Sequence, residues 1–116
     1  MNANHVLDHL EDEVFCFPAQ ASGEELYDHI TRIAGRYATE ERGLLVKAVA
    51  KWLALRSEPR TMLAVQIAVN EELTEIRPLI LELLRDVQDR KAFLPFYAKP
   101  IQMALTKLLP EPGLAS

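Results

Sequence analysis

The sequence reads LLVKAVAKWLAL over residues 44–55, and this stretch decides the fold. Only Lys47 and Lys51 interrupt the apolar residues, and their spacing of four places them on one narrow face of a helix. A helix that is apolar nearly all round must be covered on more than one side. We therefore expect residues 40–56 to form the central helix of an α-helical core.

Apolar residues recur at helical spacing on both sides of this stretch, while glycine is scarce. Before it, a helix is expected to begin at Ser22, where the hydroxyl and Glu25 together match a capping box. Pro78 is expected in or near a first turn, whereas Pro100 either starts or kinks the last helix. Further helices are expected over residues 59–70, 74–89 and up to Leu109.

The first twenty residues allow two interpretations. A helical stripe is formed by Val6, Leu10 and Val14, which favours a helix to about Glu13. Alternatively, residues 14–18 form an extended strap pressed on the core. Cys16 lies between two phenylalanines, so we expect it to be buried and unreactive.

The length and composition are those of one ordinary globular domain. The chain has 116 residues, of which 49% are hydrophobic and 26% charged. We expect one domain, with an N-terminal segment (1–20), a helical core (21–109) and a tail (110–116). No apolar run reaches the roughly 18 residues that span a bilayer, and residues 1–5 lack the features of a signal peptide. A cytoplasmic protein without a membrane contact is the expectation.

The charge is distributed unevenly along the chain. Residues 1–41 carry nine acids and two arginines, a balance of −7, whereas the remainder has eleven basic and eight acidic residues, a balance of +3. The net charge of −4 argues against nucleic-acid binding, which depends on cations that neutralise phosphates. The sequence therefore predicts one acidic end that suits a basic protein partner.

No residue pattern indicates catalysis or a cofactor. The sequence contains no GxGxxG, P-loop or HExxH motif, and we predict no enzyme activity and no cofactor. His5 and His9 are spaced for one helical face, but no second cluster accompanies them, so no metal site is predicted. Paired glutamates fall at helix starts or turns, where negative charge is favourable or solvated.

Three aromatic residues flank Pro95 in the expected connection before the last helix. They are Phe93, Phe96 and Tyr97. Aromatic side chains in a loop can anchor a protein partner, or they can fold back to cover the end of a core. Both interpretations stay open.

The central part of the chain resembles a pair of HEAT repeats. Residues 52–60 read WLALRSEPR and lead into Ala64 and Ala68, and residues 78–86 read PLILELLRD and lead into the last helix. Both stretches are similar to the pattern of the HEAT family, in which a leucine-rich helix and a turn precede a second helix with a basic residue followed by alanine and leucine positions. The resemblance implies an all-α fold of five or six antiparallel helices, as a short right-handed solenoid or a compact helical bundle.

A small acidic helical domain of this kind is also similar in character to immunity proteins of bacterial polymorphic toxin systems. That resemblance implies a non-enzymatic inhibitor that neutralises a basic toxin through an acidic surface. The alternative is an adaptor or structural subunit that docks or self-associates through apolar helix faces. The residues predicted to contact the partner are Asp8, Glu11, Asp12, Glu13, Glu24, Glu25, Asp28, Glu71 and Glu72.

Overall fold

The computed structural model describes residues 5–18, 22–93 and 95–108, and these residues form helices and short connections without any strand. The all-α prediction is confirmed. The elements are α1 (His5–Cys16), α2 (Gly23–Glu40), α3 (Arg42–Leu55), α4 (Glu58–Asn70), η1 (Thr74–Ile76), α5 (Arg77–Gln88), η2 (Pro95–Tyr97) and α6 (Ala98–Lys107), where η denotes a single 3₁₀ turn. None of these helices has both the length and the apolar composition to cross a membrane.

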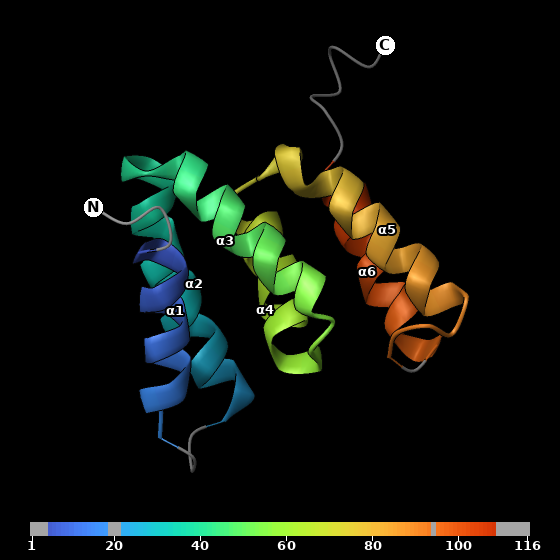
Figure 1. Cartoon of the computed structure of the whole chain (residues 1–116), viewed down its shortest axis with the longest axis horizontal. Helices are drawn as coiled ribbons and strands as arrows, with labels where there is room; N and C mark the ends of the chain where they lie inside the picture. Colours follow the sequence, from blue (N-terminus) through green and yellow to red (C-terminus); the bar gives the residue numbers. More distant parts are fainter. Residues whose placement is uncertain (1–4, 19–21, 94, 109–116) are drawn as a thin grey trace.

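The six helices pair into three antiparallel hairpins that lie side by side in a compact bundle (Figure 1). The first hairpin is α1/α2, the central hairpin α3/α4 and the third α5/α6. Helices α1, α3 and α5 contact one another in sequence, and α2, α4 and α6 do the same behind them. The two hairpins expected between residues 43 and 109 are present, whereas the pairing of α1 with α2 was not predicted.

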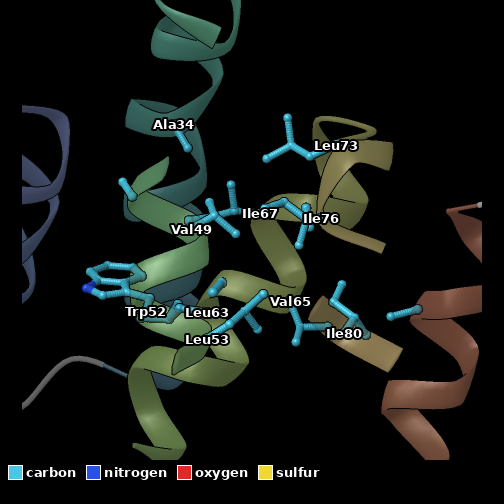
Figure 2. Close-up of a cluster of buried hydrophobic side chains, with 14 of the residues drawn as sticks. Ala34, Val49, Trp52, Leu53, Leu63, Val65, Ile67, Leu73, Ile76 and Ile80 are labelled. Carbon is cyan, nitrogen blue, oxygen red and sulfur yellow. The ribbon is translucent and has the colours of Figure 1, made fainter. Parts of the chain in front are cut away.

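Helix α3 lies at the centre, as its composition predicts. It packs against α1, α2, α4, α5 and η1. Trp52 and Leu53 are buried with Val65 and Ile67 of α4 (Figure 2). Lys47 and Lys51 are exposed, as expected, but Ala54 and Leu55 are exposed as well. The last turn of α3 therefore presents apolar atoms to solvent at the tip of the central hairpin.

The helix boundaries follow the local sequence signals. The hydroxyl of Ser22 accepts a hydrogen bond from the backbone N–H of Glu25 at 3.1 Å, which confirms the N-cap of α2. Helix α3 ends where Arg56 adopts a left-handed conformation with φ of 53°. Pro78 is the second residue of α5 and Pro100 the third of α6, so both lie in first turns and neither kinks a helix.

The N-terminal segment is a longer helix than expected. Helix α1 continues past Glu13 to Cys16, so the extended strap is wrong for residues 14–16. The prediction that Cys16 is buried is also wrong, because it is exposed. The buried stripe of α1 is built on Val6 and Leu10, and position 16 lies about 120° round the helix from Leu10.

Ion pairs between hairpins show which helix ends meet. Arg56, directly after α3, donates to Asp86 near the end of α5 at 2.8 Å. Arg60, near the start of α4, donates to Glu11 of α1 at 2.8 Å. The C-terminal ends of α1, α3 and α5 therefore lie toward the same edge of the molecule, the lower edge in Figure 1. We call this the turn edge and define it by the described residues within 12–25, 55–60 and 86–99.

Candidate protein-binding surfaces

Five of the nine predicted contact residues form an exposed acidic surface on the first hairpin. Asp8 and Asp12 are spaced by four and share the outer face of α1, whereas Glu24, Glu25 and Asp28 lie in the first turns of α2. All five are exposed, and none makes an ion pair within the described part of the chain. These carboxylates are available to cations of a partner.

Glu11 is held inside the protein's own structure. The single Nε–H of Arg60 is shared between the two carboxylate oxygens of Glu11, at 2.8 and 2.9 Å, and one of these oxygens also accepts a hydrogen bond from the indole N–H of Trp52. It therefore joins α1 to both helices of the central hairpin. A substitution at Glu11 changes the packing of α1 as well as the surface charge.

Glu13 is also engaged, between α1 and α2. Its two carboxylate oxygens lie 3.0 Å from Nε2 of His29 and 3.3 Å from Nε2 of His9. These hydrogen bonds, led by the one from His29, lower the pKa of Glu13. The Nδ1 of His9 lies 2.6 Å from the hydroxyl of Tyr37, whose pKa is raised by burial, so the hydroxyl stays protonated.

The histidines of the first hairpin line the junction between its two helices. Nε2 of His5 lies 2.7 Å from Glu41, and the rings of His5 and His9 meet Tyr37 edge-on. The ring of His29 stacks on Phe17. Among the described residues, no three His, Cys, Asp or Glu side chains are grouped so that they could hold a metal ion. His5 and His9 thus contact α2 in this fold.

Glu71 and Glu72 lie away from the acidic surface. They follow α4, at the edge opposite the turns, and their backbone carbonyls accept hydrogen bonds from Arg42 at 3.3 and 3.0 Å. The carboxylate of Glu71 lies beside Gly35 of α2. Arg42 also pairs with Glu75 at 2.9 Å and lowers its pKa. The structure therefore separates these two glutamates from the five exposed acids.

Four basic residues of the central hairpin fall into two groups, an exposed pair and a pair engaged in ion pairs. Lys47 and Lys51 are exposed on the outer face of α3. Arg56 and Arg60 are half-buried in the ion pairs that tie the central hairpin to its two neighbours. These two arginines hold the hairpins together.

The turn edge carries one large exposed hydrophobic side chain from each hairpin. Phe15 is 86% exposed at the end of α1, Leu55 is 57% exposed at the end of α3, and Phe96 is 64% exposed in η2. Phe93 and Tyr97 pack against the core, and Phe96 stacks on Tyr97 at 4.4 Å between ring centroids. Phe93 and Tyr97 therefore cover the end of the core, whereas contact with a partner stays a prediction for Phe96.

An apolar hollow adjoins this edge between α1 and the last turns of α3. It has a volume of about 420 Å³ and is lined by Leu7, Glu11, Lys51, Trp52, Ala54 and Leu55. Sequence reasoning did not single out Phe15, Leu55 or Leu7. The available signal was that α3 carries more apolar residues than one buried face can use.

Comparison with known proteins adds no relative: no family model, no curated protein and no solved structure matches the chain.

Proposed function

We propose that this chain is a non-enzymatic protein-binding domain, an immunity-type inhibitor that captures a basic protein through the acidic surface of the first hairpin. The observation that carries the proposal is the group of five exposed carboxylates on the first hairpin. Residues 1–41, which include this hairpin, have a charge balance of −7. A surface of one sign attracts an oppositely charged partner over distance and raises the association rate.

The polar neighbours of this surface support the proposal. Glu11 and Glu13 are used for internal contacts, which hold α1 in place against the central hairpin and α2. The exposed acids therefore project from a fixed support, and little side-chain packing must change when a partner binds. The histidine and tyrosine side chains at the α1–α2 junction act in this arrangement as supports.

Affinity purification with matched baits tests the proposal. One bait is the wild-type chain, and the other carries Asp8→Lys, Asp12→Lys, Glu24→Lys and Asp28→Lys. Glu11 and Glu13 are left unchanged, so that the support of α1 is kept. We expect a basic protein that the wild type retains and the variant loses, with an affinity that falls as salt rises.

A control bait carries Glu82→Lys and Asp89→Lys, two exposed acids of the third hairpin. It should retain the same protein as the wild type. Equal retention by all three baits, or an affinity that does not depend on salt, would contradict the proposal.

A second candidate function is a structural subunit or adaptor that docks or self-associates through apolar surfaces. The exposed side chains of Phe15, Leu55 and Phe96 along one edge favour it. This candidate requires no basic partner, so the two functions are separated by experiments on the purified chain alone.

A further inference from the structure

We propose that the turn edge is a homodimer interface, in which two copies of the chain meet in opposite directions about a two-fold axis beside Leu55. The proposal deepens the second candidate function and rests on it. It shares Asp12, Glu24 and Glu25 with the acidic surface, so a dimer and a basic partner compete for these carboxylates, but the dimer requires no basic partner.

Exposed apolar side chains are gathered at this one edge. Helices α1, α3 and α5 run in the same direction (Figure 1), and the ion pairs Glu11–Arg60 and Arg56–Asp86 join α1 and α5 to the central hairpin. As a result, Phe15, Leu55 and Phe96 lie along the turn edge in the order of the three hairpins. Met103, the fourth large hydrophobic side chain that is exposed among the described residues, lies in the middle of α6 and away from the turns.

The two ends of this edge carry charges of opposite sign. At the first hairpin the exposed groups are Asp12, Glu24 and Glu25. At the third hairpin they are Arg90, Lys91 and Lys99, with Asp89 as the exposed acid among them. The edge is therefore acidic at one end and basic at the other, with Leu55 between them.

Such an edge is complementary to itself in one orientation only. When the second copy is turned by 180° about the short dimension of the molecule, its third hairpin meets the first hairpin of the first copy. Acidic groups then face basic groups twice, Phe15 faces Phe96 of the second copy, and the two Leu55 side chains meet near the axis. The parallel orientation instead places acid against acid and base against base, which is unfavourable.

The dimensions of the molecule allow an interface of this kind. The bundle measures 40 × 32 × 24 Å along its principal axes, and Figure 1 shows the turns in a row along the long direction, viewed down the short one. A face of 40 by 24 Å is large enough for the about 800 Å² per partner that a standard interface buries. Apolar anchors surrounded by charged groups match the usual division into an interface core and a polar rim.

Sedimentation equilibrium on the purified chain tests the proposal. We expect the wild type to form a dimer whose dissociation constant rises with salt. Leu55→Asp places a charge at the axis, and it should raise the dissociation constant at least about thirtyfold. Met103→Asp, a matched change at an exposed apolar residue off the edge, should leave it unchanged. Circular dichroism checks that both variants remain folded.

A charge exchange tests the orientation. Variant A carries Asp12→Lys and Glu24→Lys, and variant B carries Lys91→Glu and Lys99→Glu. Each variant alone brings like charges together and should dimerise at least about tenfold more weakly than the wild type. An equal mixture should form the A–B heterodimer, because both contacts then pair opposite charges.

Each other result overturns the proposal in a recognisable way. A wild type that stays monomeric at all concentrations removes both the interface and the self-association of the second candidate function. A dimer that is insensitive to Leu55→Asp, or equally stable in A, B and their mixture, places the interface elsewhere. Neither result bears on the acidic-surface inhibitor, whose test uses a basic partner.

Discussion

The first hairpin and the central hairpin are held together by different forces. In the central hairpin, α3 and α4 pack through branched aliphatic side chains that are fully or nearly fully buried, among them Val49, Val65 and Ile67 (Figure 2). In the first hairpin, titratable side chains add to the buried apolar contact of Val6, Leu10 and Ile30, and Glu13 lies between His9 and His29. The difference indicates that the central hairpin stabilises the fold, whereas the polar contacts of the first hairpin hold its exposed acids in position.

This contrast has a consequence for local unfolding. Buried aliphatic contacts open only with the whole fold, whereas a helix held by partly exposed hydrogen bonds and few buried side chains opens at lower free energy. Helix α1 has two fully buried residues, Val6 and Leu10. We expect its amide hydrogens to exchange with solvent faster than those of α3 and α4.

The largest effect is expected in the central hairpin. Ile67 of α4 has no exposed surface, so Ile67→Ala leaves a cavity between α3 and α4 and should lower the free energy of unfolding by about 2 to 5 kcal/mol. Chemical denaturation with circular dichroism measures the change. Gln66→Ala, on the exposed face of the same helix, is the control, and a loss as large there would show that the helix register is wrong.

The sequence was sufficient to predict this core. The apolar stretch 44–55 predicted the central place of α3, and the Ser22 cap, Pro78 and Pro100 predicted where helices begin. These predictions succeed because they depend on local backbone geometry and on the number of apolar faces that must be covered.

Contacts between distant residues were beyond the reach of the same reasoning. Glu11, Glu13, Arg56 and Arg60 look like ordinary solvated charges in the sequence, and only the fold shows that they join separate helices. The exposure of Cys16 and Leu55 depends on where neighbouring helices end, which no local pattern records. The observed surface therefore differs from the predicted one. Glu11 and Glu13 support α1 from within the fold, and Phe15 and Leu55 are exposed at the turn edge.

The next largest effect is expected at the tie between the first and central hairpins. Glu11→Gln keeps the size of the side chain but removes the charge that Arg60 and the Trp52 indole contact, and it should cost about 1 to 2 kcal/mol. Hydrogen exchange should rise in α1 and stay constant in α5 and α6. Asp12→Asn, one residue away and exposed, should change neither quantity. A uniform rise over all helices would contradict the local role of Glu11.

A smaller effect is expected from the hydrogen bond between Tyr37 and His9. Tyr37→Phe removes the hydroxyl but keeps the half-buried ring, and it should cost about 0.5 to 1.5 kcal/mol. The same denaturation experiment measures it, with Tyr27→Phe as the control, because the hydroxyl of Tyr27 makes an exposed and long contact of 3.4 Å. Equal losses in the two variants would show that the His9 contact contributes nothing particular.

The smallest expected effect is the pH dependence of the stability that the Glu13 contact contributes. The pKa of Glu13 in the folded protein lies below the 4.5 of an unperturbed glutamate, because His29 and His9 hydrogen-bond to its ionised form. Its contribution to stability is therefore complete above the unfolded value and is lost as the pH falls through the folded value. We expect the difference in unfolding free energy between wild type and Glu13→Gln to shrink as the pH falls from the unperturbed value of 4.5 through the lower folded pKa, because protonation makes the two side chains alike. Asp28→Asn, at an exposed acid on α2, provides the control for general acid effects. If the difference for Glu13→Gln stays constant over this range, the carboxylate does not join α1 to α2 through its charge, and the contrast between the two hairpins then depends on apolar packing alone.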